Sequence, residues 1–157
     1  MILLLGGSGL VGSALRKRIP EAVAPPKSEL DLADEAATEE FFRAHKPKTV
    51  IHAAAYVAGI AENSSNPEQI YEQNSRIDRS VFAAAEGAGT KELFYFGSNC
   101  AYSPESSQPF REESLLAGET EPTNWGFARS KRESLAKIHL AHSTGRRWHA
   151  FLPCSLY

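Results

Sequence analysis

The sequence has little cysteine and no spacing of residues typical of a metal site. Its two cysteines, Cys100 and Cys154, are too few for a disulfide framework, and its five histidines are scattered along the chain. No stretch approaches the roughly 20 apolar residues of a membrane-spanning helix, and the opening apolar run at residues 2–5 is too short for a signal peptide. We therefore expect no metal, no membrane association and a reducing, cytoplasmic location.

The sequence also has no large excess of one charge. Its formal net charge of -2 at pH 7 provides no basic field that would attract nucleic acid or an anionic membrane surface. The composition, with 42% hydrophobic and 23% charged residues in a chain of 157, is typical of one globular domain. Nucleic acid is therefore not an expected partner.

Short apolar runs alternate with longer segments of helical periodicity. Strands are expected at residues 2–5, 21–24, 49–52, 93–96 and 148–152, and helices from the glycine loop to Pro20 and at residues 34–44, 66–86 and 124–142. This alternation predicts an α/β fold, a Rossmann-type doubly wound parallel sheet with helices on both faces. The Pro-, Ser- and Glu-rich stretch 103–123 is expected to be a long functional loop.

A glycine-rich turn joins the first expected strand to the first helix. Gly6, Gly9 and Gly12 are evenly spaced, and Leu10 and Val11 open the helix. Glycines permit a tight turn and let backbone N–H groups approach a phosphate closely, while the helix N-terminus adds partial positive charge. We interpret this loop as the pyrophosphate site of a dinucleotide; the alternative is a tight turn that binds no ligand.

The end of the second expected strand bears on the choice of cofactor. An acidic residue there would bind a ribose 2′-hydroxyl, whereas a basic residue would accommodate a 2′-phosphate. The sequence offers Pro25, Pro26, Lys27 and Ser28, which is a lysine with no acid at the strand tip. This favours NADP over NAD, unless Lys27 is only a solvated surface charge.

Polar residues interrupt the apolar faces of two expected helices. Asn74 lies in the apolar stripe of the helix at 66–86, and Lys131 lies in that of the helix at 124–142. A buried amide needs hydrogen-bond partners, so Asn74 is expected to orient a backbone group or a water beneath the active site, or to be a satisfied structural asparagine. An ammonium group in such a stripe needs a hydroxyl or an anion, which a cofactor ribose would supply, unless Lys131 reaches solvent.

Two reactive side chains follow the fourth expected strand. Ser98 and Cys100 lie at its carboxyl end, where doubly wound sheets form their ligand crevice. A serine hydroxyl can donate a hydrogen bond to a carbonyl oxygen, and a thiol can move protons. The alternative for Cys100 is a small buried hydrophobe. Nothing in the sequence indicates a nucleophilic serine, since the Gly-x-Ser-x-Gly pattern does not occur.

Segments along the whole chain resemble the extended short-chain dehydrogenase/reductase superfamily, or NAD-dependent epimerases/dehydratases, and within it the GDP-L-fucose synthase family. The segments are residues 6–15, 29–32, 52–60, 71–74, 96–102, 116–124 and 152–157. The Gly-Ser-x-Cys-x-Tyr and Glu-Pro-Thr-Asn stretches among them are specific to that family. The resemblance implies that NADPH is the cofactor and that a GDP-4-keto-6-deoxy sugar is first epimerised and then reduced at its ketone.

The resemblance also implies roles for individual residues. Ser98 would hydrogen-bond the C4 oxygen of the sugar, Cys100 would be one acid/base of the epimerisation, and Lys131 would bind the nicotinamide ribose. Lys27 matches the position of a basic residue that holds the 2′-phosphate. Further cofactor contacts would come from the family-like segments that contain Asp31, Leu32, Ala53, Ala54 and Ala55.

Two departures from the family pattern limit what it implies. The superfamily's catalytic tyrosine lies four residues before its lysine, and Phe127 occupies that position here. A phenyl ring has no proton to give, so we expect reduction to be weakened by about 10²–10⁴-fold, the usual contribution of a general acid. Family members also continue beyond Tyr157 into further sheet and a substrate-binding region that carries an acid/base histidine. The sugar pocket and the epimerisation pair are therefore expected to be incomplete in this chain.

Three interpretations remain open. Residues 1–157 form an NAD(P)-binding Rossmann domain that is the N-terminal part of a longer nucleotide-sugar epimerase/reductase; or they are a complete non-catalytic module that binds a dinucleotide or a partner protein; or they are a structural protein whose loop binds nothing. We favour the first, because the last expected strand has no helix after it and would leave an exposed edge or face. A second copy of the chain could supply that cover, so a homo-oligomer is a further expectation.

Overall fold

The computed structural model describes residues 1–153, which contain a parallel sheet with its four strands in the order β1–β2–β3–β4. The strands are β1 (Ile2–Leu5), β2 (Thr49–His52), β3 (Glu92–Phe96) and β4 (Arg147–Phe151). The helices are α1 (Leu10–Arg18), α2 (Glu35–His45), α3 (Ile60–Ser65), α4 (Pro67–Gly87) and α5 (Trp125–Ser143), with short 3-10 helices η1 (Asn99–Ala101), η2 (Glu112–Ser114) and η3 (Pro122–Asn124). Cys154 and the end of the family-like segment 152–157 lie outside the described residues.

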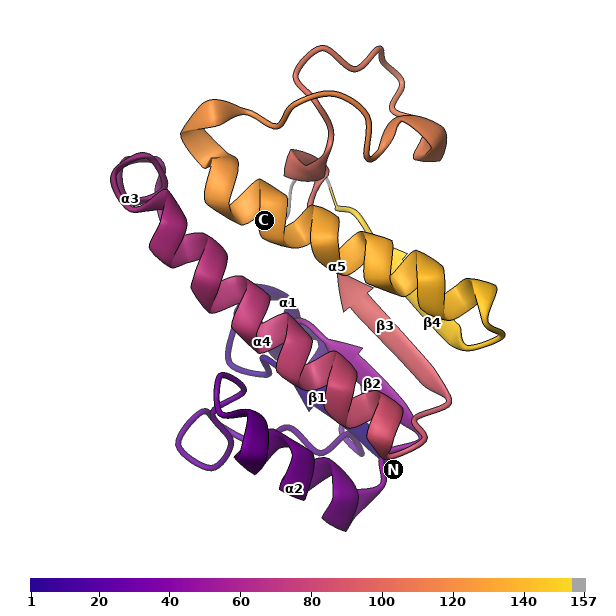
Figure 1. Ribbon diagram of the computed structural model, residues 1–157. Coiled ribbons are helices and arrows are strands. Elements are labelled where there is room, and N and C mark those ends of the chain that lie inside the picture. The colour runs from indigo at the N-terminus through magenta and orange to yellow at the C-terminus, as the bar shows by residue number, and fades with distance from the viewer. Residues whose placement is uncertain (154–157) are drawn as a thin grey trace.

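The helices cover both faces of the sheet, as predicted. Figure 1 shows α2, α4 and α5 in front of the strands and α1 behind them. The right-handed crossover rule accounts for this division. From β1 the chain first runs to one edge and then returns across the sheet to β2, β3 and β4, so the helix of the first crossover lies on the opposite face from the others. The doubly wound α/β prediction is confirmed.

The strand expected at residues 21–24 is reduced to a single paired residue in the structure. Only Val23 pairs with the sheet, as an isolated parallel bridge to Leu3. Val23 donates to the carbonyl oxygen of Ile2 at 3.0 Å, and its own carbonyl accepts from Leu4 at 2.8 Å. Pro25 and Pro26 follow directly, and because proline has no N–H they cannot extend the pairing. The chain therefore touches the edge of β1 and turns away into the loop that carries Lys27.

Two rows of side chains on the face of the sheet that α4 and α5 cover explain how polar groups become buried. Leu3, Val50, Leu93 and Trp148 are register partners across the strands, and each is at most 1% exposed. Because side chains alternate along a strand, the residues two positions further on face the same way. That second row contains His52 and Tyr95 as neighbours, so an imidazole and a phenol point into the helix–sheet interface instead of solvent.

The helix boundaries follow their local signals closely. Asp34 caps α2, since its side-chain oxygen accepts from the Ala37 N–H at 3.0 Å, and Pro67 opens α4, where a missing N–H is harmless. The expected bounds of α2, α4 and α5 differ from the observed ones by one residue at each end. None of the helices within residues 1–153 has both the length and the apolar character needed to cross a membrane.

Candidate functional site

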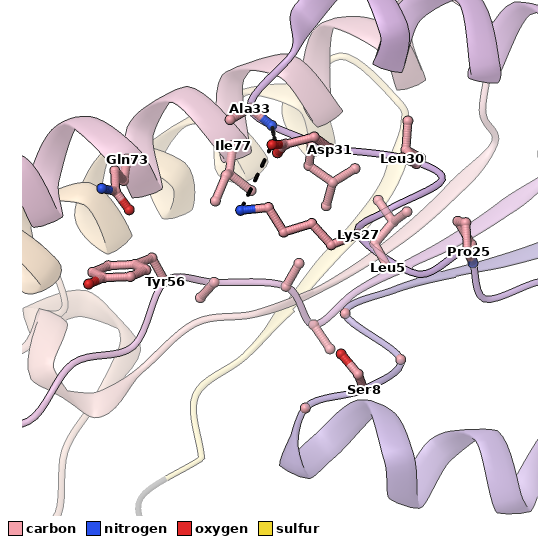
Figure 2. A pocket seen from close by; sticks show the side chains of 17 residues that line it. Leu5, Ser8, Pro25, Lys27, Leu30, Asp31, Ala33, Tyr56, Gln73 and Ile77 are labelled. Atoms are coloured by element: carbon pink, nitrogen blue, oxygen red, sulfur yellow. Dashed lines mark hydrogen bonds and ion pairs between the residues drawn. The ribbon is translucent and has the colours of Figure 1, made fainter.

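A crevice of about 470 Å³ opens at the carboxyl ends of β1 and β2. Most of the predicted cofactor residues line it, namely Gly6, Gly9, Lys27, Asp31, Leu32, Ala53, Ala54 and Ala55. Figure 2 shows how these walls come from separate parts of the chain, with Ser8 in the glycine loop on one side and Gln73 and Ile77 on α4 on the other. Leu10, Val11 and Gly12 lie just beyond it in the first turns of α1.

The glycine loop is closed so tightly that side chains would not fit at two positions. Gly6 has a φ of +84°, and a Cβ there would come within 2.6 Å of the Ala54 nitrogen. A Cβ on Gly12 would collide with the Gly6 carbonyl oxygen. The turn is fastened by a hydrogen bond from the Gly9 N–H to that same oxygen at 3.0 Å. The crevice is thus lined by the glycine loop up to Gly9, the residue directly before α1, and a helix N-terminus is a position that suits an anion.

The mouth of the crevice carries an acid as well as a base. Lys27 Nζ lies 3.8 Å from Asp31 Oδ2, and both side chains line the crevice. The prediction considered only the strand tip, where no acid stands, and it did not foresee that Asp31 lies beside Lys27. The chain turns back after Pro26, whose carbonyl accepts from the N–H groups of Glu29 and Leu30 at 3.0 Å each, and this brings Asp31 beside Lys27.

A second cavity of about 300 Å³ unites two of the predicted catalytic positions. Cys100 and Phe127 both line it, together with residues of the segment 57–63 and of η3. Cys100 is only partly buried, which argues against the alternative of a buried hydrophobe. Ser98 lies beside it, and its hydroxyl oxygen accepts from the Cys100 N–H at 3.3 Å. The structure thus places Cys100 and Phe127 in one cavity and Ser98 next to Cys100, although Ser98 itself is not among the residues that line the cavity.

Asn74 is fully buried and acts on the backbone beside the crevice. Its Oδ1 accepts from the Tyr56 N–H at 3.0 Å, and its Nδ2 donates to the carbonyl oxygens of Tyr56 and Ile70 at 2.9 Å each. These bonds join α4 to the segment after β2, where Ala55 and Tyr56 line the crevice. Asn74 is therefore a buried asparagine with its hydrogen bonds satisfied, and the backbone that it holds, at Tyr56, belongs to the wall of the crevice.

Lys131 is held inside the protein by a cluster of polar side chains. It is 1% exposed, so the alternative that it reaches solvent is wrong. Its Nζ donates to the Tyr95 hydroxyl at 2.7 Å and lies 3.7 Å from Asp78 Oδ2. Asp78 also accepts from Tyr95 at 2.6 Å, from Ser134 at 2.6 Å and from His52 Nε2 at 2.9 Å. Among the described residues, Lys131 belongs to the lining of neither cavity.

The ion pair offsets the cost of burying these charges. Burial alone would raise the pKa of Asp78, but Lys131 and the hydrogen bonds from His52 and Ser134 outweigh it, so this pKa lies well below its usual range. Burial lowers the pKa of Lys131, and Asp78 opposes that effect. Burial together with Asp78 raises the pKa of Tyr95 well above its usual value. Tyr95 is thus a permanent donor to Asp78.

Sequence reasoning did not find Asp78, His52, Tyr95 or Ser134. One signal was present, since Asp78 lies four residues after Asn74 and therefore on the same inward face of α4. The remaining partners come from β2, β3 and α5, and only the packed fold brings them together. No three His, Cys, Asp or Glu side chains within residues 1–153 form a cluster that could hold a metal ion.

The long loop after β3 is fastened by one guanidinium group. Arg132 on α5 donates to the carbonyl oxygens of Ala101 at 2.6 Å, Gly118 at 2.6 Å and Ala117 at 3.0 Å. Ala101 ends η1, the turn that contains Cys100. The same side chain therefore joins η1, whose Cys100 lines the second cavity, to the chain at Ala117 and Gly118.

Replacing Arg132 with methionine is expected to loosen this loop while the sheet stays intact. The change removes three hydrogen bonds from a charged donor, so amide hydrogen exchange over residues 103–118 should accelerate by roughly tenfold or more. Exchange measured by mass spectrometry would show it. Arg129→Met is the matched control, because Arg129 on the same helix pairs with Glu133 and lies over the rings of Tyr71 and Trp125, and none of these described contacts is with residues 103–118. Equal exchange in both variants would contradict the assigned role.

Comparison with known proteins gives consistent matches. A family model described as "NAD dependent epimerase/dehydratase family" matches residues 2–157. The chain is 36% identical over 163 residues to a putative GDP-L-fucose synthase 2 of Arabidopsis thaliana, covering 99% of this chain and 49% of that protein. It is 34% identical over 165 residues to the GDP-L-fucose synthase of Escherichia coli (strain K12), covering 99% and 50%. The chain thus spans about half the length of these curated relatives.

A solved structure agrees with these matches. The crystal structure of a GDP-D-glycero-L-gluco-heptose synthase from Campylobacter jejuni, in the presence of NADPH, superposes with a TM-score of 0.93 at 25% identity. The match covers 99% of this chain and 47% of that one. The similarity therefore extends over the whole sheet and both cavities described above.

Proposed function

Because the chain belongs to the NAD dependent epimerase/dehydratase family, we propose that it is the NADP(H)-binding part of a nucleotide-sugar epimerase/reductase of the GDP-L-fucose synthase type. The observation that carries this proposal is the crevice itself. The glycine loop, Lys27 and the segment after β2 line one cavity of about 470 Å³. That size is within the range of cofactor sites, and the relatives named above support the choice of ligand.

The residues of the crevice fit a dinucleotide. The missing side chains at Gly6 and Gly12 let the backbone close the turn tightly beside the crevice. A pyrophosphate would lie against this turn, and Leu10 and Val11 would present the N–H groups of α1 to it. Lys27 would pair with the 2′-phosphate. Asp31, Leu32, Ala53, Ala54 and Ala55 would contact the rest of the cofactor, which when bound supplies a hydride.

The second cavity suits the sugar of a GDP-4-keto-6-deoxy sugar nucleotide. Ser98 would donate its hydroxyl to the C4 oxygen, and Cys100, which reaches the cavity, would exchange a proton with a neighbouring carbon. Lys131 would bind the nicotinamide ribose once it leaves Tyr95. Asn74 would act indirectly, by fixing the backbone at Tyr56. The relatives' names support this substrate class.

A second candidate function is binding without turnover. Phe127 lines the second cavity in place of a tyrosine, so the position that would protonate the sugar oxygen carries no proton. Lys131, the expected partner of that tyrosine, is bonded to Tyr95. These two observations favour a dinucleotide-binding module, in which NADP(H) occupies the crevice and sugar reduction is slow.

Calorimetric titration with NADP and with NAD tests the proposed cofactor. We expect NADP to bind more tightly, and Lys27→Ala to weaken NADP binding by about fivefold while changing NAD binding by less than about twofold, because only NADP offers a 2′-phosphate to an exposed ammonium. Lys17→Ala is the control, since that lysine lies at the far end of α1. Equal affinities for the two nucleotides, or no loss in Lys27→Ala, would be evidence against the proposal.

A further inference from the structure

Lys131 stands apart from the other side chains proposed to meet the cofactor, because within residues 1–153 it lines neither of the two cavities described above. Phe127, one turn earlier on α5, does line the second cavity. A helical turn rises by about 5.4 Å, and the flexible four-carbon stem of a lysine can cover such a distance. The ammonium group of Lys131 can therefore reach a bound ligand, but in this structure it points into the protein.

Tyr95 and Asp78 hold Lys131 in that inward position. The Lys131 Nζ donates to the Tyr95 hydroxyl at 2.7 Å and lies 3.7 Å from Asp78 Oδ2. The Tyr95 hydroxyl gives its own proton to Asp78 at 2.6 Å, so its oxygen turns a lone pair to the lysine. All three residues are at most 2% exposed. Charge-assisted hydrogen bonds are strong in such dry surroundings, so the inward position is a stable one.

The carboxylate that retains the lysine is itself fixed in place. Asp78 Oδ1 accepts from His52 Nε2 at 2.9 Å, and Asp78 Oδ2 accepts from the Ser134 hydroxyl at 2.6 Å. Together with Tyr95, these donors come from β2, β3 and α5 and converge on one side chain of α4. The anion therefore cannot follow the lysine. Any movement of Lys131 toward a ligand breaks both the hydrogen bond to Tyr95 and the ion pair.

Phe127 offers the ammonium group no competing acceptor on the side of the second cavity. Its ring centroid lies 5.5 Å from Lys131 Nζ, whereas the Tyr95 ring centroid lies at 4.6 Å. A phenyl ring attracts a cation only weakly, through its face, and it has no oxygen. The balance of contacts favours the inward position until a ligand supplies hydroxyl groups or phosphates.

We infer that Asp78 and Tyr95 are positioning residues that form a latch, which holds Lys131 away from the cofactor until NADP(H) draws the lysine out to its ribose. This inference rests on the proposed function of the crevice. Because the conformation with Lys131 outward is the minor one, the apparent affinity for NADP(H) is lower than the crevice would give with the lysine already free. The buried ion pair thus controls cofactor binding in addition to stabilising the fold.

Asp78→Asn tests the latch, because asparagine keeps an oxygen for Tyr95 and Ser134 and removes the charge that retains Lys131. We expect the folded variant to bind NADP about tenfold more tightly in calorimetry, since one hydrogen bond to a charged group no longer opposes binding. The double variant Asp78→Asn/Lys131→Met should lose this gain, because no ammonium group is left to reach the ribose. A purely structural residue would give the opposite sign, since loosening a fold leaves ligand binding unchanged or weakens it.

Glu86→Gln is the matched control for the loss of charge. Glu86 is also an acid of α4 that pairs with a lysine of α5, since its Oε1 lies 3.0 Å from Lys137 Nζ. Neither residue lines the crevice or the second cavity. Removing this charge should therefore change the affinity for NADP by less than about twofold.

A second measurement uses the wild-type chain and does not depend on a destabilised variant. Nuclear magnetic resonance of isotope-labelled tyrosine follows the ring of Tyr95, whose signal is assigned with Tyr95→Phe. Tyr95 lines neither cavity, but its hydroxyl loses the bond from Lys131 when the latch opens. We therefore expect saturating NADP to shift this signal.

The outcomes separate the latch from the proposed function. An affinity for NADP that does not rise in folded Asp78→Asn, a gain that survives Lys131→Met, or a Tyr95 signal that stays in place at saturation would overturn the inference alone. If calorimetry detected no binding of NADP to the wild-type chain, the proposed function itself would fail and the inference with it.

Discussion

Asp78→Ala is expected to lower the free energy of unfolding by about 3–5 kcal/mol, because it removes one partner of a buried ion pair and leaves Lys131 without a counter-charge. The loss is large against the 5–15 kcal/mol that typically stabilises a domain. His52, Tyr95 and Ser134 would also each lose an acceptor. Urea unfolding followed by circular dichroism measures the effect.

Two further measurements separate the ion pair from simple truncation. Ser134→Ala removes one donor to Asp78 and leaves the charges in place, so it should cost only about 1 kcal/mol. The folded-state pKa of Asp78 is depressed, so its stabilisation is fully present above its unfolded pKa of about 3.9 and is lost as pH falls below that value. The difference between wild type and Asp78→Ala should therefore shrink in acid. A constant difference from pH 7 to pH 2 would contradict the electrostatic account.

Phe127→Tyr is expected to accelerate ketone reduction by about 10²–10⁴-fold, since it restores a general acid to the second cavity. The ring centroid of Phe127 lies 5.5 Å from Lys131 Nζ, so a phenol here would stand beside an ammonium. The chain spans about half of its relatives. The assay therefore uses a chimera in which the second half comes from the Escherichia coli GDP-L-fucose synthase.

The readout is NADPH oxidation with a GDP-4-keto-6-deoxy sugar. Phe127→Leu in the same chimera is the control, because it changes the ring without adding a proton donor and should give no gain. Adding Lys131→Met to Phe127→Tyr should remove most of the gain if the ammonium assists the phenol. A restored tyrosine that left the rate unchanged would show that this cavity is not where the ketone is reduced.

Local signals in the sequence were enough to predict most of the fold. Gly6 and Gly12 fix the turn between β1 and α1, because Gly6 has a positive φ and neither position has room for a Cβ. Asp34 and Pro67 mark the starts of α2 and α4 through their own chemistry. Periodicity could not show that only Val23 pairs beside β1, because that outcome depends on the prolines that follow.

The candidate site was less predictable, because its partners are distant in sequence or meet through a turn. The spacing of apolar residues identified Asn74 and Lys131 as buried polar groups, but it could not reveal that Lys131 meets Tyr95 and Asp78. Asp31 was predicted as a cofactor contact, but its pairing with Lys27 was not, for a related reason. Asp31 is four residues away, and only the turn after Pro26 brings its carboxylate to the crevice.

The hydrogen bonds of Arg132 have a consequence for how such a protein can diversify. One guanidinium fastens the chain at Ala101 and again at Ala117 and Gly118, so the segment between these points is a loop with both of its ends anchored. Lengthening an anchored loop costs little conformational entropy, because the closure term grows only with the logarithm of its length. Insertions or exchanges there would leave Cys100 and the lining of the second cavity in place, because none of the residues that line it lies between Ala101 and Ala117.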